Sequence, residues 1–332
     1  MPYHSAKGYT GSGQLGLLMV FLGLGFILAG FVQIALAFRV VPEGTSMNDI
    51  ADAMLKAFKD PRNVDVARLS QVLGTFFLLC IPAWLFSRVV NGPKWFWLGF
   101  NHYFNIRQVM IGFLIIFAAN ILAGPLADAS KALMQYLPSL DAKARELEDM
   151  YNEQVAILSN LHDWKEYLVA VLIMAFFPAL FEEMFFRGAL QNLLVRWWKL
   201  PLLAIIVTSL LFSLIHSSVY LFLSRAALGF ALGLIYHQTR NIWVSVIAHF
   251  LNNFLALTQL YVLSRKTGKI DVEQIDPKME WWIGILALVA LIVLFRYLNR
   301  ISDLNRSRVQ ARYQVLMETE SNEPPFVHKQ TQ

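Results

Sequence analysis

Long stretches without a charged side chain recur along the whole sequence. Residues 15–38 contain no Asp, Glu, Lys or Arg, and residues 167–181 lack them as well. About 20 consecutive, mostly apolar residues are enough for a helix to cross the hydrocarbon core of a bilayer. The sequence therefore predicts an all-α fold, a polytopic bundle of transmembrane helices.

The composition excludes most soluble classes of protein. Hydrophobic residues make up 57% of the 332 residues and charged residues 15%, whereas a soluble domain has about 45–50% and about 25%. The single cysteine, Cys80, excludes an intramolecular disulfide framework and a cysteine-based metal centre. The net charge of +5 is modest, and no aromatic-rich basic patch predicts a nucleic-acid partner.

About eight membrane spans are expected from the apolar runs. The first is interpreted as a retained helix, because its run exceeds the roughly 7–15 apolar residues of a signal peptide; cleavage after 35–37 is the alternative. An even number of spans places both termini on one side, and the arginines after the last span favour the cytoplasm. The predicted spans of this multi-pass cell-membrane protein are 15–38, 69–89, 109–126, 164–181, 201–216, 219–236, 242–262 and 281–298.

Polar segments divide these spans into regions. Ile50, Met54 and Phe58 fall on one helical stripe, which predicts an amphipathic helix within residues 39–68. The tail from residue 299 is basic at first and is then expected to be disordered. The expected regions are 1–126 with three spans and an interfacial segment, 127–163 as a polar amphipathic segment, 164–262 as a core of four spans, and 263–332 as the last span with the basic tail.

Ionisable residues within apolar spans are costly and by default indicate function. Glu182 and Glu183 follow the charge-free run 167–181, and Arg187 lies four residues after Glu183. Glu183 and Arg187 can therefore form a structural ion pair. Glu182 points about 100° away on a helix and has no charged residue one turn on, which suits a general base. The alternative is that both glutamates only anchor the helix at the membrane interface.

Three polar residues on later spans complete the set. His216 closes one span, and His249 and Asn253 lie one turn apart on another. Each has an ordinary alternative, a structural histidine or hydrogen bonding between membrane helices. Arg225, in the sixth span, either reaches the interface or lines a cavity.

Two chemistries fit Glu, His and His with Asn on three helices. Glu182, His216 and His249 can bind Zn²⁺, which then activates a water molecule. Alternatively, Glu182 and one histidine activate water directly, while the other histidine and Asn253 stabilise an oxyanion. Both suit hydrolysis of an acyl bond, most simply a peptide, with either no cofactor or zinc.

The motifs EExxxR, FxxxH and HxxxN occur here in that order on successive apolar segments, as Glu182-Glu183…Arg187, Phe212…His216 and His249…Asn253. This pattern resembles the CAAX prenyl protease and bacteriocin-processing (CPBP, or Abi) family of intramembrane proteases, over about residues 165–258. The resemblance implies a catalytic base at Glu182, a structural pair at Glu183 and Arg187, and further catalytic positions at His216, His249 and Asn253. It leaves metal dependence open.

The expected function is thus an intramembrane endopeptidase that acts on a membrane-associated protein or peptide, with or without a lipid modification. The sequence has no HExxH, GxSG or GxGD motif, so other intramembrane protease classes are disfavoured. The alternatives are a non-enzymatic scaffold or immunity protein of the same fold, and a proton-coupled transporter that uses the same ionisable residues. The sequence does not identify the substrate.

Overall fold

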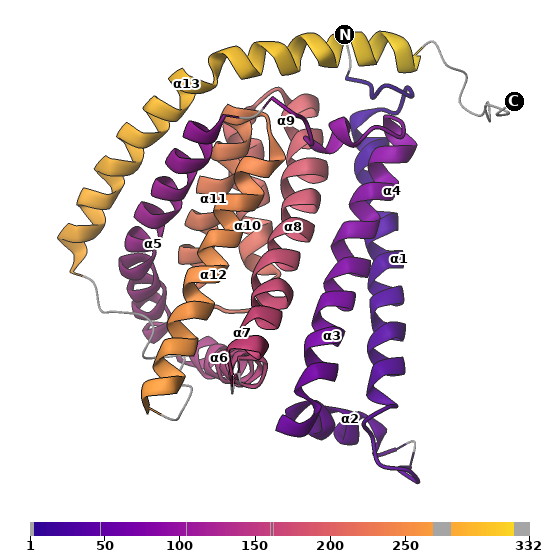
Figure 1. The fold of residues 1–332 in the computed structure, drawn as a ribbon, viewed down its shortest axis with the longest axis vertical. Helices are drawn as coiled ribbons and strands as arrows, with labels where there is room; N and C mark the ends of the chain where they lie inside the picture. The colour runs from indigo at the N-terminus through magenta and orange to yellow at the C-terminus, as the bar shows by residue number, and fades with distance from the viewer. Residues whose placement is uncertain are drawn as a thin grey trace, which may run out of the picture.

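The protein is an all-α helical bundle, as predicted (Figure 1). A computed structural model describes residues 3–46, 48–103, 105–159, 161, 163–267 and 280–321. Within these ranges the only β-type pairing is an isolated bridge between His4 and Thr10. The fold class is therefore confirmed.

The first four helices form one side of the molecule (Figure 1). They are α1 (Gly11–Ala37), α2 (Ile50–Lys59), α3 (Val64–Thr75) and α4 (Ile81–Val90). The amphipathic helix expected within residues 39–68 is shorter than its segment, and the second span starts earlier than predicted. A π-helical turn, Phe76–Cys80, joins α3 to α4, so the chain continues through Pro82 at the start of α4. A Cβ added to Gly25 would lie 2.5 Å from the Phe77 carbonyl oxygen, so this glycine allows α1 close to that turn.

The third span extends beyond its predicted end at residue 126. Helix α5 runs over Ile106–Gln135 and contains Pro125. Membrane helices tolerate proline where neighbouring groups satisfy the freed backbone, so the apolar run ended before the helix did. The rest of the polar segment forms α6 (Pro138–Leu158), which lies across the lower end of the bundle in Figure 1.

The helix that carries the two glutamates is long and irregular. It consists of α7 (Trp164–Ala170), α8 (Phe177–Glu183) and α9 (Asn192–Trp198), joined by π-helical stretches over Val171–Phe176 and Met184–Gln191. Turns of this kind occur frequently at functional sites. The remaining core helices are α10 (Pro201–Leu214), α11 (Phe222–Thr239) and α12 (Ile242–Thr267).

The C-terminal tail is helical over its described part, which corrects the expectation of disorder after the basic stretch. Helix α13 extends over Trp281–Ser321 and crosses the upper end of the molecule (Figure 1). Its last part packs through Tyr313, Leu316 and Met317 against Ala6 and Trp97. Apolar residues at these helical intervals give the polar segment a buried stripe. The tail beyond residue 321 lies outside the described residues.

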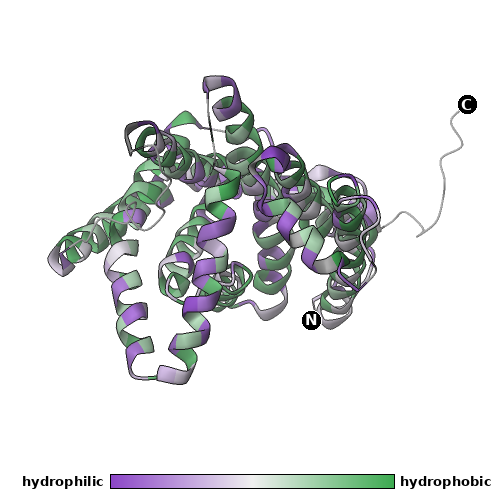
Figure 2. Cartoon of the chain, turned by 90° about the horizontal axis from the view of Figure 1, so that it is seen from below, coloured by the Kyte–Doolittle hydropathy of each residue, from purple (hydrophilic) through white to green (hydrophobic). Residues whose placement is uncertain are grey.

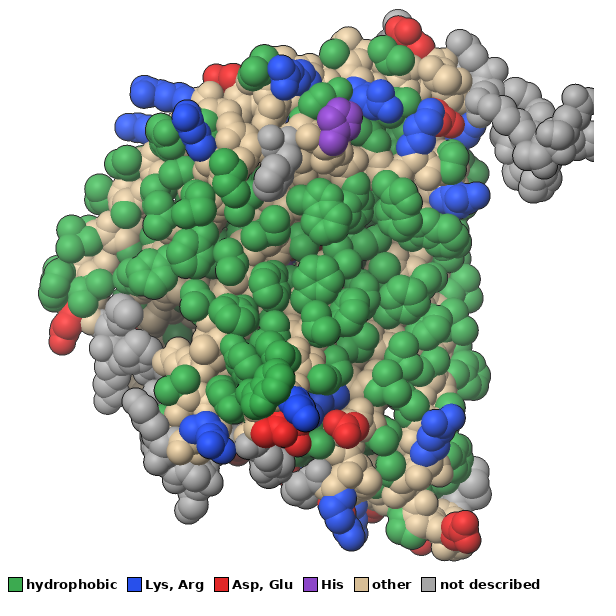
Figure 3. Space-filling view, viewed as in Figure 1, with side chains coloured by type: hydrophobic (Ala, Val, Ile, Leu, Met, Phe, Trp, Pro, Cys, Tyr) green, Lys and Arg blue, Asp and Glu red, His purple; other side chains and the backbone are tan. Residues whose placement is uncertain are grey.

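Six helical segments of the described chain are long and apolar enough to cross a membrane, and α10 is a shorter apolar helix. Figure 3 shows a broad hydrophobic band between two ends that carry charged side chains. Viewed from the end that carries α6, the helices mix hydrophilic and hydrophobic residues (Figure 2). These features are those of a multi-pass membrane protein.

Candidate active site

The adjacent glutamates at the end of α8 have different surroundings. Glu183 is fully buried, and its Oε1 lies 2.9 Å from Nη1 of Arg187 on the following turn. Glu182 Oε2 is also buried but makes no hydrogen bond with the described residues. Because adjacent residues project about 100° apart on a helix, one carboxylate forms an ion pair while the other remains available.

Besides this ion pair, Arg187 contacts two other helices, α10 and α11. Its Nη2 donates a hydrogen bond of 2.9 Å to the carbonyl oxygen of Gly229 on α11. Its guanidinium lies 4.8 Å from the centroid of the Phe212 ring on α10, a cation–π contact. The interior that holds Glu183 therefore contains a compensated charge, not an isolated one.

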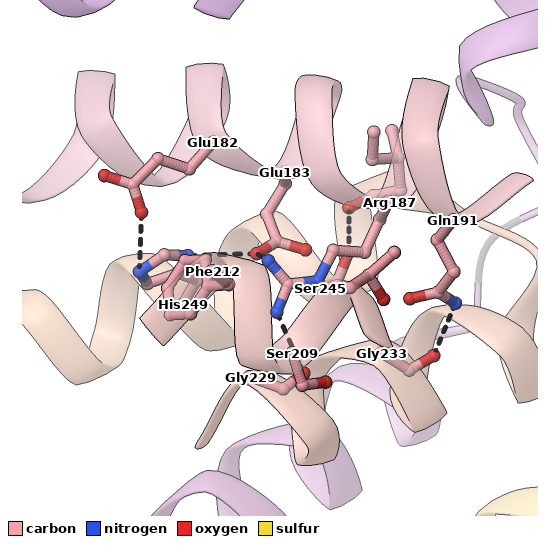
Figure 4. A network of polar contacts seen from close by, with 12 residues as sticks. Glu182, Glu183, Arg187, Gln191, Ser209, Phe212, Gly229, Gly233, Ser245 and His249 are labelled. Carbon is pink, nitrogen blue, oxygen red and sulfur yellow. Dashed lines mark hydrogen bonds and ion pairs between the residues drawn. The ribbon is translucent and has the colours of Figure 1, made fainter. Parts of the chain in front are cut away.

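His249 on α12 is held by the same carboxylate. Its Nδ1 lies 3.0 Å from Glu183 Oε1 (Figure 4). A carboxylate only accepts hydrogen bonds, so we assign the hydrogen to Nδ1 of His249. Glu183 thus orients the imidazole as well as balancing Arg187, a second role that the sequence did not reveal because the two residues lie 66 positions apart.

His216, just after α10, is oriented in a similar way. Its Nδ1 lies 2.8 Å from the carbonyl oxygen of Phe212, which fixes the hydrogen on that nitrogen. The Phe212 ring packs against both imidazoles, with centroids 4.8 Å from His216 and 5.8 Å from His249. One phenylalanine therefore supports both rings and the Arg187 guanidinium.

The two remaining imidazole nitrogens converge on the unbonded glutamate. Nε2 of His249 lies 3.8 Å and Nε2 of His216 lies 4.0 Å from Glu182 Oε2. Figure 4 shows Glu182 and His249 facing each other from their separate helices. These separations exceed a direct hydrogen bond and suit a small molecule such as water between the groups.

Asn253 lies one turn beyond His249 and is connected to two further asparagines. Asn252 Nδ2 donates to Asn253 Oδ1 at 3.2 Å, and Asn120 Nδ2 donates to Asn252 Oδ1 at 2.6 Å. Since the oxygen of Asn253 accepts the bond, its Nδ2 group is left to donate elsewhere. Sequence reasoning missed Asn120, which comes from α5.

All four residues predicted to be catalytic line one cavity of about 360 Å³. Helices outside the motif region form part of its wall: Gln71 comes from α3, and Tyr151 and Gln154 come from α6. The cavity lies towards the end of the bundle that carries α6 (Figure 1). The predicted site residues lining it are Glu182, His216, His249 and Asn253.

Arg225 also lines this cavity, which decides between the two interpretations of that residue. Its Nη1 donates a 3.2 Å hydrogen bond to the His216 carbonyl oxygen. Its guanidinium stands 4.5 Å from the ring centroid of Tyr151 on α6. Arg225 therefore connects the cavity to the helix that covers it.

A zinc site built from Glu182, His216 and His249 would need three donors about 2.0–2.2 Å from one ion. Among the residues that the structure describes, no group of three or more His, Cys, Asp or Glu side chains is arranged to hold a metal. The side chains as placed do not fit a metal centre, and no chemical step is derived through one.

Comparison with known proteins supports the family suggested by the motifs. Residues 164–255 match the family described as type II CAAX prenyl endopeptidase Rce1-like. The uncharacterized protein YpbD of Bacillus subtilis (strain 168) is 34% identical over 85 residues, which are 24% of this chain and 40% of that protein. No solved structure matches the chain. The match covers the segment that carries all three motifs and is consistent with the predicted family.

Proposed function

We propose that this chain, whose residues 164–255 match the Rce1-like family, is an intramembrane endopeptidase. It hydrolyses a peptide bond in a membrane-associated protein or peptide. The observation that supports this most directly is Glu182 Oε2, a buried oxygen without a hydrogen bond that faces the Nε2 atoms of two histidines. A base beside two oriented imidazoles is an arrangement suited to activating water.

In the first step, Glu182 takes a proton from a water molecule. His216, which carries its hydrogen on Nδ1, accepts the other water hydrogen at Nε2 and so orients the water. The water oxygen forms a bond to the substrate carbonyl carbon, and the carbonyl electron pair moves onto its oxygen. The new oxyanion needs donors, which reduce the barrier most when they are already in place.

His249 and Asn253 supply those donors. In its doubly protonated form, His249 donates through Nδ1 to Glu183 Oε1 and through Nε2 to the oxyanion. Asn253 donates through Nδ2, because its oxygen is occupied by Asn252. When the tetrahedral intermediate collapses, the carbon–nitrogen bond breaks and Glu182 returns its proton to the leaving amine. The products are a carboxylic acid and an amine, which exchange a proton to become a carboxylate and an ammonium group, and the site is restored.

The test is proteolysis of a peptide library by the purified full chain in detergent, with cleavage products identified by mass spectrometry. Glu182→Gln keeps the size and polarity of the side chain but removes the base. The variant should fold normally and lose about two to four orders of magnitude in turnover. Glu146→Gln, the same change at an exposed ion pair on α6, is the matched control and should retain activity. Full activity of Glu182→Gln would reject the assignment and favour the scaffold alternative.

We propose that this hydrolysis is metal-independent. A chelator should leave turnover unchanged, and the active protein should contain no stoichiometric zinc. His249→Ala should then reduce turnover about 10²–10³-fold, as for loss of an oxyanion donor. Stoichiometric zinc that is lost together with activity on chelation would reject this proposal while leaving the peptidase assignment intact.

We propose further that the substrate carries a lipid, because an apolar cavity lies beside the catalytic one. An apolar cavity of about 490 Å³ lies between α5, α6 and the α10–α11 connection, lined by residues such as Leu133, Leu214 and Phe222. It shares α6 and α11 with the catalytic cavity, so a substrate could reach both. Comparing kcat/KM for one peptide with and without an attached lipid tests this, and equal values would contradict it.

We also propose that both termini face the cytoplasm. Basic residues in short segments beside the spans favour the cytoplasmic side, and α13 carries several of them beyond its apolar part. The catalytic cavity, which lies towards the opposite end, would then open away from the cytoplasm. The arginines concerned are Arg296, Arg300, Arg306, Arg308 and Arg312.

A further inference from the structure

A further cavity, which shares no lining residue with the catalytic cavity, has a basic lining. It has a volume of about 640 Å³ and lies where α9 and α11 end beneath α13 (Figure 1). Four cationic side chains line it, and its lining contains no Asp or Glu. The four are Arg196, Lys199, Arg240 and Arg306.

Three of these cations have no acidic partner among the residues that the structure describes. Arg306 forms an ion pair with Asp303 on its own helix. Among the residues that the structure describes, no carboxylate pairs with Arg196, Lys199 or Arg240. Arg196 is held in place by the ring of Tyr313, whose centroid lies 4.5 Å from its guanidinium carbon. Like charges that share a cavity repel one another, so this concentration is unfavourable unless an anion occupies it.

The backbone at two of the cations is also unusual. Lys199 and Arg240 have φ angles of 57° and 54°, and they cap the C-terminal ends of α9 and α11. Non-glycine residues in this left-handed region are uncommon and often mark functional positions. A cation at a helix C-terminus also offsets the helix dipole, but that effect does not require two such helices to end in one cavity.

We infer that this cavity binds a phosphate group, that of an anionic phospholipid headgroup. Arginine guanidinium groups donate paired hydrogen bonds that match phosphate oxygens, and basic pockets between membrane helices bind such headgroups. The lining adds neutral donors, Ser307 and Gln310 on α13. It also contains Phe96, from the aromatic cluster Trp95–Leu98, and aromatic residues favour the level of lipid headgroups.

Occupation of the site would fasten α13 to the bundle. The cavity wall combines α9 and α11 of the family segment with Arg306, Ser307 and Tyr313 of α13, which lies outside it. An anion that contacts both sides adds attraction between them that the protein alone lacks. The site therefore predicts that anionic lipid stabilises the whole chain, independently of peptidase activity.

The experiment measures lipid binding and thermal unfolding of the full chain in nanodiscs. Discs contain phosphatidylcholine alone, or phosphatidylcholine with phosphatidic acid as the anionic probe. The variant Lys199→Asn with Arg240→Asn removes two charges, and asparagine tolerates the left-handed backbone. The control, Arg308→Gln with Arg312→Gln, removes two charges from exposed positions of α13 that are outside the cavity.

Phosphatidic acid should raise the Tm of the wild-type protein and remain bound in native mass spectrometry. Each cation near an anionic surface contributes about a fivefold gain in affinity, so the cavity variant should bind about 25-fold more weakly and lose the Tm rise. The control should retain both. Equal losses of lipid affinity and of the Tm rise in the two variants would indicate a diffuse attraction of basic residues to anionic lipid, and would overturn the proposed site.

Two further arms identify the source of the phosphate. Inorganic phosphate is added to the neutral discs at constant ionic strength, and we expect no rise in Tm. A rise that the cavity variant abolishes would overturn the headgroup and assign the site to a soluble phosphate. If the double variant does not fold, Lys199→Asn alone, at an exposed position, replaces it; unchanged lipid affinity in that variant would count against the site.

Discussion

Glu183 Oε1 lies 2.9 Å from a guanidinium nitrogen of Arg187 and 3.0 Å from an imidazole nitrogen of His249. Glu183→Gln keeps the shape of the side chain but leaves Arg187 buried without its counter-charge. Breaking one partner of a fully buried pair costs about 3–5 kcal/mol, so we expect a strongly lowered Tm or poor yield in detergent. Thermal unfolding of the purified protein measures this.

The neighbouring residue provides a matched control. Glu182→Gln makes the same chemical change one position earlier, where the side chain faces the cavity, and its Tm should stay close to that of the wild-type protein. A Glu183→Gln protein as stable as the wild type would show that the charge of Arg187 is balanced elsewhere.

The hydrogen-bonded asparagines Asn253, Asn252 and Asn120 predict losses of turnover of different size. Asn253→Ala removes a proposed oxyanion donor and should reduce kcat about 10²–10³-fold with little change in KM. Asn120→Ala removes only a residue that positions Asn252, through a 2.6 Å hydrogen bond, and should reduce kcat by less. Steady-state kinetics on one cleaved peptide compares them. An equal loss in both variants would contradict the donor role of Asn253.

Part of the site could be predicted from single residues. Charges in apolar spans are costly, so Glu182, Glu183 and Arg187 were conspicuous in the sequence. The second function of Glu183, orienting His249, depends on how α8 and α12 pack. No local pattern encodes that contact, and the same holds for Asn120 and the wall residue Gln71.

At the scale of helices, apolar runs predicted where spans exist better than where helices end. Helix α5 continues beyond Pro125, and α13 continues beyond its apolar part to Ser321. A helix ends where its backbone N–H and C=O groups no longer find hydrogen-bond partners within the helix. An apolar run ends where the segment leaves the hydrocarbon core of the bilayer. The π-helical stretch Met184–Gln191 was not predicted, because its backbone pattern has no distinct side-chain signature.

Helix α6 forms part of the wall of the proposed catalytic cavity. Two of its polar contacts are a 2.6 Å hydrogen bond from the Tyr220 hydroxyl to Asp141 and one of 2.6 Å from the Ser218 hydroxyl to Glu148. Tyr220→Phe with Ser218→Ala should loosen α6 while leaving the catalytic groups in place. We expect faster hydrogen exchange across Pro138–Leu158 and a change in KM larger than that in kcat.

Lys143→Gln is the control, because it breaks an exposed pair with Glu146 within α6 itself, and it should change neither measurement. The Tyr220 hydroxyl and the Arg145 guanidinium lower the pKa of Asp141. The stability that the ionised Asp141 carboxylate contributes is therefore fully present above the ordinary carboxyl pKa, and it is lost only as the pH falls through the lowered pKa. The difference between the variant and the wild type should therefore persist at pH 5; its disappearance there would argue against Asp141 as an anchor.

At the scale of the whole molecule, the segment that matches the family carries the proposed catalytic groups, and the rest of the chain completes the wall of the cavity. Residues 164–255 contain the four predicted catalytic side chains, but the cavity also needs Gln71 from α3, Ile116 from α5 and Tyr151 from α6. The family match does not reach these walls, so the resemblance does not describe this part of the proposed substrate cavity.

The arrangement of the molecule in the membrane yields the last prediction. If the basic part of α13 lies in the cytoplasm, α6 at the opposite end faces the outside (Figure 1). Single cysteines are introduced as Arg308→Cys on α13 and Lys143→Cys on α6, both exposed, with the buried Cys80 replaced by alanine. A membrane-impermeant maleimide should label the α6 cysteine in intact cells and the α13 cysteine only in inverted vesicles. Both cysteines should react in detergent. The reverse labelling pattern would place the catalytic cavity on the cytoplasmic side and would show that the positive-inside rule does not describe this chain.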